Sequence, residues 1–508
     1  MQEMSRRNQH FTDSVIRRMT RVSLDCGAIN LAQGFPDFDP PKAMTDRLRE
    51  VSQEGPHQYP ITMGAPNFRR AVSRKCGRFM GISIDPDTNI VVTIGSTEAM
   101  VDTIFALTNP GDKIVMFSPY FENYRAQAIM ADCEPVFVPL VPPSFHFDPE
   151  VLEDAFRQHP KAMTDRLREV SQEGPHQYPI TMGAPNFRRA VSRKCGRFMG
   201  ISIDPDTNIV VTIGSTEAMV DTIFALTNPG DKIVMFSPYF ENYRAQAIMA
   251  DCEPVFVPLV PPSFHFDPEV LEDAFRQHPK AILICNPSNP SGKVFTYEEL
   301  KFISELCIKY DVYAIMDEVY EHIVYDGRQM VYMASLPGMW ERTVSCSSLS
   351  KTYSITGWRL GYAIAPQPIM DRIKQYHDFN TVGAASPLME AAVVGLEMPD
   401  EYYREFGDHY AHMKGIFTGG MKDLDIPFTD PEGTYFVLAD IAPYMKKGQS
   451  DVEFCVEMAQ KVGVACVPGS SFFDEDVNHI VRLHFAKKDE TLLAALDRLS
   501  NLRRIMCG

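Results

Sequence analysis

The chain has no long apolar run. None of its 508 residues fall in a stretch near the ~18 apolar residues that a membrane-spanning helix needs. Its start, MQEMSRRNQHFTDSVIRRM, lacks the apolar core of a secretory signal, and Glu3 and Asp13 argue against a transit peptide. The hydrophobic content of 45% and the charged content of 23% are those of an ordinary globular chain. We therefore expect an enzyme of the cytoplasm.

Basic charge and metal-binding patterns are also scarce. The net charge of −17 argues against a protein that binds nucleic-acid backbones, which needs clustered Lys and Arg. The eleven cysteines form no CxxC pair, and several lie in apolar runs such as ILIC and GVACV, which is typical of a reducing compartment. The thirteen histidines form no HxxxH or HExxH pattern. We expect no nucleic acid, no membrane and no metal among the partners.

What the chain does have is an error-free internal repeat. The octapeptide AFRQHPKA at Ala155–Ala162 leads into MTDRLREV, an amphipathic helix pattern. It returns at Ala274–Ala281 and leads into ILICNP, a strand pattern. Residues Pro41–Ala162 are identical, letter for letter, to Pro160–Ala281 at an offset of 119.

This repeat is too long and too uniform for a solenoid, whose diverged repeats run to about 20–50 residues. It resembles a recent tandem duplication, and removing one copy leaves 389 residues. Residues 41–159 are called the first copy below, and residues 160–281 the second copy.

Helix and strand patterns alternate along the chain. KAMTDRLREVSQE and NFRRAVSRKCGRF predict amphipathic helices. Short apolar runs predict strands buried on both faces, namely NIVVTIG, DKIVMFSP, EPVFVPL, AILICNP, VYAIMDE and RTVSCSS. Their alternation with helices favours βαβ units in a mainly parallel sheet. After about Gly395 the pattern becomes α+β, with a helix in EYYREFGDHYAHMKGIFTGGM and strands in GTYFVLADI and HIVRLHFA.

We expect the second copy to fill the fold, because an insertion near Pro40 and Pro41 lies nearer the surface than one just before a central strand. The first copy would then be an extra insert with unpaired strand edges and exposed apolar faces. The predicted division is an N-terminal arm of the small domain (1–40), the inserted first copy (41–159), a large domain with the second copy (160–395) and a C-terminal small domain (396–508).

Three chemically active side chains gather in SSLSKTYSITGWRLGY. Lys351 follows a predicted buried strand, Ser348 precedes it by three residues, and Arg359 follows it by eight. An amine, a hydroxyl and a guanidinium suit an aldehyde that carries a phosphate: the amine forms a Schiff base, and the other two hold the dianion. The alternative is a surface lysine and a structural arginine.

Two further segments favour the first interpretation. Asp317 follows the run VYAIM, where a carboxylate could pair with a protonated pyridine nitrogen, and Tyr320 lies three residues on. Asn289, in NPSNPSG, lies beyond AILIC, where an amide could donate to a ring oxygen. Each signal alone is weak, because Asp and Asn are common at strand ends.

Taken together, NPxNPxG, DExY, SxxK and GWRxGY, in that order, resemble the class I and II aminotransferases, which are pyridoxal 5′-phosphate (PLP) enzymes of fold type I. The resemblance covers essentially all 389 non-redundant residues. INLAQGFPDFDPP and MASLPGMWERT resemble the kynurenine/glutamine branch, which includes methionine and aromatic aminotransferases. The resemblance implies an α/β fold: a large domain around a mainly parallel seven-stranded sheet, a smaller α+β domain, and here one repeated segment as an insert.

The resemblance also implies roles for single-copy residues. Lys351 resembles the Schiff-base lysine and general base, and Asp317 the partner of the pyridinium nitrogen. The other roles fall on Asn289 and Tyr320 at the 3-oxygen, Ser348 and Arg359 at the phosphate, Arg482 at the substrate carboxylate, and Gly34 in the arm that closes over the substrate.

Some roles fall inside the repeat, where two residues compete for each. GSTEAM resembles the start of the phosphate-binding helix, SPYFENY the segment that stacks on the ring, and HQYP the tyrosine that reaches the phosphate of a neighbouring subunit, which implies a homodimer. The second-copy residues are Ser215, Thr216, Phe240 and Tyr178, and their first-copy equivalents are Ser96, Thr97, Phe121 and Tyr59.

The implied activity moves an amino group from an L-amino acid to a 2-oxo acid. Aromatic, methionine, glutamine or kynurenine-like amino acids are the expected donors. Two alternatives stay open: a PLP-dependent β-lyase that acts on cysteine conjugates, and an inactive or poorly folded duplication product. His322, beside the DExY motif, would line the pocket or serve as a hydrogen-bonded structural histidine.

Overall fold

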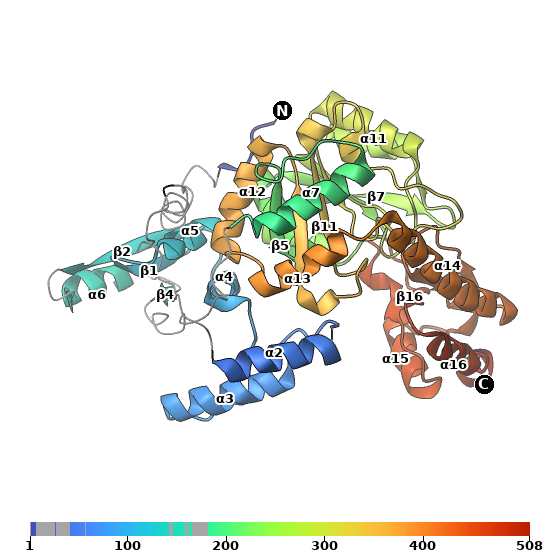
Figure 1. Cartoon of the computed structure of the whole chain (residues 1–508), viewed down its shortest axis with the longest axis horizontal. Helices are drawn as coiled ribbons and strands as arrows, with labels where there is room; N and C mark the ends of the chain where they lie inside the picture. Colours follow the sequence, from blue (N-terminus) through green and yellow to red (C-terminus); the bar gives the residue numbers. More distant parts are fainter. Residues whose placement is uncertain are drawn as a thin grey trace.

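The computed structural model describes residues 2–6, 26, 41–55, 57–141, 146–157, 162–164 and 181–507. In Figure 1 residues 181–507 form the main body, and the described part of the first copy extends from one side of it. None of the described helices is both long enough and apolar enough to span a bilayer.

The main body is built on one eight-stranded sheet, with the order β5-β12-β11-β10-β9-β6-β7-β8. Five neighbouring strands of this sheet are parallel to one another: β11, β10, β9, β6 and β7. Strand β12 runs antiparallel to both β11 and β5. The sheet has one strand more than the predicted seven, because the two-residue β8 pairs antiparallel with the edge strand β7. The bounds are β5 Ile209–Ile213, β6 Lys232–Ser237, β7 Glu253–Val260, β8 His265–Phe266, β9 Ala281–Cys285, β10 Tyr313–Asp317, β11 Thr343–Ser348 and β12 Leu360–Ile364.

Helices cover both faces of this sheet (Figure 1). Successive residues of a strand point to opposite faces. In β10, accordingly, Tyr313 and Ile315 pack into one core cluster, and Ala314 and Met316 pack into another. The continuous apolar runs of the sequence therefore do form strands buried on both sides, as predicted. The helices are α7 Pro185–Met199, α8 Gly214–Leu226, α9 Asn242–Met249, α10 Pro268–Arg276, α11 Tyr297–Tyr310, α12 Gln367–Asn380 and α13 Ser386–Leu396.

The C-terminal segment forms a four-stranded antiparallel sheet with the order β13-β14-β16-β15, flanked by helices. The predicted helix after Gly395 and the two predicted strands are confirmed as α14, β14 and β16. The domain boundaries themselves stay a prediction. The bounds are α14 Asp400–Asp423, β13 Phe428–Thr429, β14 Phe436–Asp440, α15 Asp451–Lys461, β15 Val467–Pro468, β16 Ile480–His484, α16 Asp489–Leu499 and α17 Leu502–Cys507.

A separate four-stranded sheet, with the order β3-β2-β1-β4, contains three strands of the first copy. Its last strand, β4, lies at the start of the second copy and runs parallel to β1. The bounds are α2 Lys42–Glu54, α3 Pro66–Met80, α4 Gly95–Leu107, β1 Lys113–Ser118, α5 Glu122–Met130, β2 Glu134–Val141, β3 His146–Phe147, α6 Pro149–Arg157 and β4 Ala162–Thr164.

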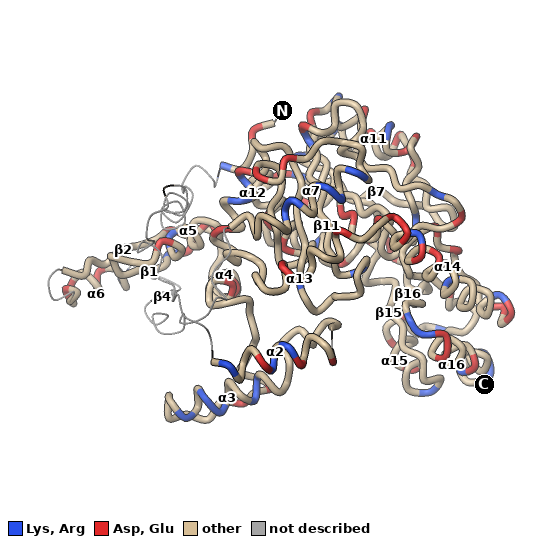
Figure 2. Tube along the Cα trace, in the orientation of Figure 1, with Lys and Arg blue, Asp and Glu red and all other residues tan. Residues whose placement is uncertain are grey.

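Much of the apolar surface in the first copy is uncovered. Phe68 in α3 is 54% exposed, whereas the same position of α7, Phe187, is fully buried. Helix α2 buries no residue, and its surface carries both signs of charge, including an ion pair of 2.5 Å between Lys42 and Asp46 (Figure 2). A segment that keeps its helices but not their packing partners leaves its apolar faces in water.

One sequence prediction fails in the first copy. NIVVTI forms β5 in the second copy but no strand at residues 89–94. In the second copy β12 pairs with this segment, and Val210 is fully buried. The single-copy β12 cannot pair twice, and the equivalent Val91 is 61% exposed. The tertiary partner, not the local sequence, therefore decides whether this strand forms.

Candidate active site

A cavity of about 320 Å³ opens where the strands of the large sheet end. Asp317 is the last residue of β10, Ser348 is the last of β11, and Asn289 follows β9 by four residues. The carboxyl ends of parallel strands meet at one edge of a sheet, which is where such folds bind ligands. The lining residues are Tyr59, Ser215, Thr216, Phe240, Asn242, Tyr243, Cys285, Asn289, Asp317, Val319, Tyr320, Ser348, Lys351, Arg359, Phe436 and Arg482.

A buried carboxylate marks one end of this cavity. Asp317 is buried and accepts a hydrogen bond of 2.7 Å from the hydroxyl of Tyr243 and one of 3.2 Å from the N–H of Val319. Burial raises the pKa of Asp317, and these two donors together with Lys351 oppose the rise. A carboxylate fixed in this way offers its remaining acceptor capacity to a protonated ring nitrogen.

Tyr243 was not singled out in the sequence. It lies three residues after Phe240, in the SPYFENY segment; Tyr243 is in the first turn of α9, Phe240 precedes that helix, and both line the cavity. The spacing was the available signal.

The amine of Lys351 lies among aromatic rings. Its Nζ lies 5.2 Å from the ring centre of Tyr59, 5.7 Å from that of Tyr435 and 5.8 Å from that of Tyr320. Burial lowers the pKa of Lys351, but Tyr435 and Tyr59 outweigh it, and the pKa is raised overall. Among the described residues no carboxylate forms a salt bridge with this amine, so it is available to a ligand.

The part of the cavity around Arg359 is suited to a dianion. Arg359 approaches the start of α8 so closely that a Cβ on Gly214 would lie 2.5 Å from Nη2, and glycine has none. The guanidinium donates to two backbone carbonyls, at 3.3 Å to Thr356 and 3.5 Å to Ile213. It forms no salt bridge with the described acidic side chains.

This unpaired cation lies beside the hydroxyls of Ser215, Thr216 and Ser348 and the N-terminus of a 13-residue helix. Backbone N–H groups at a helix start and an arginine fork are the usual ligands of a phosphate group. The residues present therefore fit the phosphate of PLP at this end and its ring nitrogen at Asp317.

A second arginine stands on the other side of the cavity. Arg482, in β16, lies between two phenyl rings, 4.3 Å from the centre of Phe436 and 4.5 Å from that of Phe472. Its Nη1 donates a hydrogen bond of 2.7 Å to Oδ1 of Asn289. Burial lowers the pKa of Arg482, although an arginine stays charged at any pH near neutrality. A carboxylate is the ligand that such a fork recognises.

The repeat contributes to the cavity from both copies. Ser215, Thr216 and Phe240 of the second copy line it, whereas their first-copy equivalents do not. One of those equivalents, Phe121, is 47% exposed. The tyrosine comes instead from the first copy, as Tyr59. Gly34 and Tyr178 lie outside the described residues.

His322 does not line the cavity. It is buried beside Glu321 and packs edge-on against Phe198, with ring centres 4.6 Å apart. Burial lowers the pKa of His322 to about 3, so its imidazole is neutral. These contacts support the interpretation of His322 as a structural histidine.

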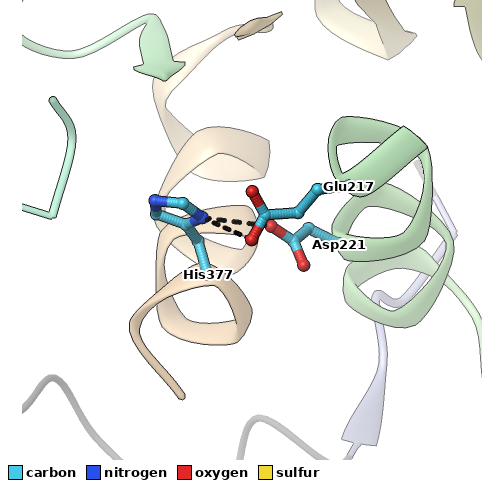
Figure 3. Close-up of side chains that lie close together, drawn as sticks. All are labelled: Glu217, Asp221 and His377. Atoms are coloured by element: carbon cyan, nitrogen blue, oxygen red, sulfur yellow. Dashed lines mark hydrogen bonds and ion pairs between the residues drawn. The ribbon is translucent and has the colours of Figure 1, made fainter. Parts of the chain in front are cut away.

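A buried cluster that the sequence did not point to lies between α8 and α12. Glu217, Asp221 and His377 point toward one another there (Figure 3). One ligand-type atom of each lies within 4.8 Å of the others. Nδ1 of His377 lies 3.1 Å from Glu217 and 3.4 Å from Asp221. Burial lowers the pKa of His377, but the two carboxylates outweigh it and raise it to about 10. We interpret the cluster as a protonated His377 that lies between two carboxylates and joins α12 to α8.

The comparisons with known proteins agree with this geometry. Residues 27–166 and 159–499 both match the family "Aminotransferase class I and II". The chain belongs to this family. A probable N-succinyldiaminopimelate aminotransferase of Mycobacterium tuberculosis is 33% identical over 356 residues, which cover 68% of this chain and 89% of that protein. Human kynurenine–oxoglutarate transaminase 1 is 32% identical, over 64% of this chain and 84% of its own.

Solved structures show the same fold. YbdL of Escherichia coli, whose structure and reactivity identify a methionine aminotransferase function, aligns with a TM-score of 0.61 at 32% identity. The alignment covers 65% of this chain and 85% of that one. The protein is thus an aminotransferase of PLP fold type I that depends on pyridoxal phosphate, with its amino-acid substrate left open.

Proposed function

We propose that the cavity around Lys351 is the transamination site, with Asp317 and Arg359 fixing the two ends of the cofactor. The observation that carries this proposal is the set of groups that line one cavity: a buried carboxylate, together with an amine and a guanidinium that form no salt bridge with the described acidic side chains. PLP supplies an aldehyde that takes up the substrate amine and a ring that absorbs the electrons released at Cα.

Each remaining group has a positioning task. The Asp317 carboxylate keeps the proton on the ring nitrogen, and Tyr243 holds that carboxylate in place. Asn289 and Tyr320 lie on the side of the cavity suited to the ring oxygen. Ser348, Arg359 and the start of α8 hold the phosphate, while Arg482 binds the α-carboxylate that all the substrates share.

Lys351 is the proposed base. With PLP held in the cavity, the amine of Lys351 would move a proton between the substrate Cα and the neighbouring carbon. A tethered amine serves both atoms because it stays within reach of each. The phenol rings of Tyr59, Tyr320 and Tyr435 surround this amine.

The proposed donors are large uncharged amino acids, of the aromatic, methionine, glutamine or kynurenine-like kind. The relatives' names include methionine and kynurenine, and the cavity wall beside Arg482 is aromatic. We further propose a cytoplasmic location, which the free and largely buried cysteines support. A homodimer and an origin of the repeat by tandem duplication complete the proposal.

The test is a donor and acceptor panel with the purified chain and added PLP. Transamination predicts that each good donor yields its 2-oxo acid only when an acceptor 2-oxo acid is present. A β-lyase would instead release pyruvate and ammonia from a cysteine conjugate without any acceptor. No turnover of any donor by a soluble, PLP-loaded chain would contradict the proposal.

A further inference from the structure

The first copy reaches into the cavity with one short loop. The N–H of Tyr59 donates a hydrogen bond of 3.0 Å to Oγ1 of Thr356, and the carbonyl of His57 accepts one of 2.7 Å from the N–H of Gly357. The side chain of Gln58 donates at 2.9 Å to the carbonyl of Ser354. Three successive residues of the loop are thus fixed to the segment between Lys351 and Arg359.

This docking leaves the Tyr59 ring in the site. Its centre lies 5.2 Å from Nζ of Lys351 and 5.0 Å from Cζ of Arg359. Burial raises the pKa of Tyr59, but Lys351 and Arg359 outweigh it, and the pKa is lowered overall. Tyr59 as a whole residue is 53% exposed, and it lines the cavity. A phenol beside the phosphate-binding arginine is placed to donate a hydrogen bond to a bound phosphate.

A second contact shows how the first copy sits on the main body. Helices α4 and α8 have the same sequence, GSTEAMVDTIFAL, and they meet through the same positions. Phe105 contacts Phe224, its own equivalent 119 residues later, with ring centres 5.9 Å apart. Glu98 and its equivalent Glu217 line one cavity of about 370 Å³ between these helices.

Contacts between equivalent residues of two identical segments are what a two-fold axis produces. In an isologous interface the same patch is used on both sides. Here one chain supplies both sides. A buried hydrogen bond also joins the first copy to the main body, since the side chain of Gln127 donates at 3.1 Å to the carbonyl of Phe379 in α12.

We infer that the first copy occupies, within the same chain, the surface on which a second copy of the chain would dock, and that Tyr59 completes the PLP phosphate site in cis. The 508-residue chain therefore carries the part of a partner subunit that its own site needs, and a homodimer through this surface is left to a chain with one copy of the repeat. This inference rests on the proposed function and adds a source for the tyrosine: residue 59 of the same chain, not residue 178 and not a second molecule.

The repeat provides its own matched pair of variants. Tyr59→Phe and Tyr178→Phe remove the same hydroxyl from the same local sequence, HQYP, in the full-length chain. We expect Tyr59→Phe to weaken PLP binding by about 10- to 100-fold, because the variant loses a hydrogen bond to a charged group. We expect Tyr178→Phe to stay within about twofold of the parent chain. PLP affinity is read from the visible absorbance during titration.

A mixing experiment tests whether the tyrosine of each PLP site comes from the same chain or from another chain. Tyr59→Phe chains, which keep Lys351, are combined with Lys351→Ala chains, which keep Tyr59, after the two are unfolded and refolded together. Supply in cis predicts that the mixture binds PLP no more tightly than the Tyr59→Phe chains alone. High-affinity PLP binding in the mixture would overturn the inference. So would a loss of PLP affinity in Tyr178→Phe in place of Tyr59→Phe. A parent chain that binds no PLP would instead overturn the proposed function, so the two failures are distinguishable.

Discussion

Nη1 of Arg482 donates a hydrogen bond of 2.7 Å to Oδ1 of Asn289, 193 residues earlier in the chain. This bond joins the C-terminal sheet to the carboxyl edge of the large sheet. It couples the residue proposed to bind the substrate carboxylate to the residue proposed to bind the cofactor oxygen. The two proposed subsites are therefore held in register by one side-chain contact.

Replacing Arg482 should impair substrate binding more than cofactor binding. Arg482→Lys keeps a charge but loses the planar fork that a carboxylate fits. We expect kcat/KM for every amino-acid donor to fall by about 10- to 100-fold, the equivalent of about 1.5–3 kcal/mol, with PLP still bound. Steady-state kinetics and the absorbance of bound PLP measure the two effects separately. A loss confined to one donor would mean that Arg482 reads the side chain instead.

Lys351→Ala should abolish turnover while leaving the fold intact. The loss of a positioned base alone costs about 10²- to 10⁴-fold in rate. Thermal unfolding within a few degrees of that of the parent chain is the control for folding. Transamination by Lys351→Ala at more than about a tenth of the parent rate would exclude this residue as the base.

Tyr243→Phe tests a positioning residue. Without its 2.7 Å hydrogen bond, the carboxylate of buried Asp317 is less well stabilised, and the pKa of Asp317 rises further. Since the ionised form is the one that holds the ring proton, we expect the acidic limb of the kcat profile to move to higher pH, with little change at the alkaline side. A uniform loss at all pH values would indicate a packing role only. Tyr239→Phe, in the same segment, is a suitable control because Tyr239 does not contact Asp317 in the described structure.

The cluster of Figure 3 predicts a loss of stability at alkaline pH. The pKa of His377 is raised from 6.5 to about 10, so its stabilising charge is fully present below pH 6.5 and is lost as the pH approaches 10. Burial and Glu217 raise the pKa of Asp221 to about 7, so this group changes little above that value. We expect the free energy of unfolding to fall by about 2–4 kcal/mol between pH 7 and 10. Urea unfolding at both pH values measures it, and His377→Gln should flatten the dependence.

Deleting the first copy should make cofactor binding depend on protein concentration. A 389-residue chain without residues 41–159 has to take the tyrosine from a second molecule, if the inference on Tyr59 holds. PLP affinity should then fall on dilution through the dissociation constant of the dimer. The 508-residue chain should show no such dependence. Titrations at several protein concentrations, with light scattering for the mass, compare the two.

The single-copy part of the site was predictable because its residues follow strands that are apolar on both faces. Once β9, β10 and β11 are parallel neighbours, their ends meet, and Asn289, Asp317 and Ser348 meet with them. Tyr243 and the cluster around His377 were not predictable in this way. Each depends on the packing of α8, α9 and α12, and no short motif encodes that packing.

The repeat shows the limit of local sequence most directly. The octapeptide AFRQHPKA leads into the five-residue strand Ala281–Cys285 and into the three-residue strand Ala162–Thr164. After Ala162 the sequence continues as MTDRLREV, which has a helix pattern. KAMT itself begins helix α2 at residue 42 and lies across strand β4 at residues 162–164. In β4 the chain pairs with β1 as β9 pairs with β6, so the neighbouring strand overrides the helical preference.

The most direct test of the account is the visible absorption spectrum of the size-fractionated 508-residue chain with PLP, before and after a good amino-acid donor is added. The account predicts a band of bound cofactor that fades with the donor, returns with a 2-oxo acid, and is altered in Lys351→Ala. A soluble chain of the correct mass with no such band, or with a band that no donor changes, would contradict the claim that Lys351, Asp317 and Arg359 form a working PLP site in this chain.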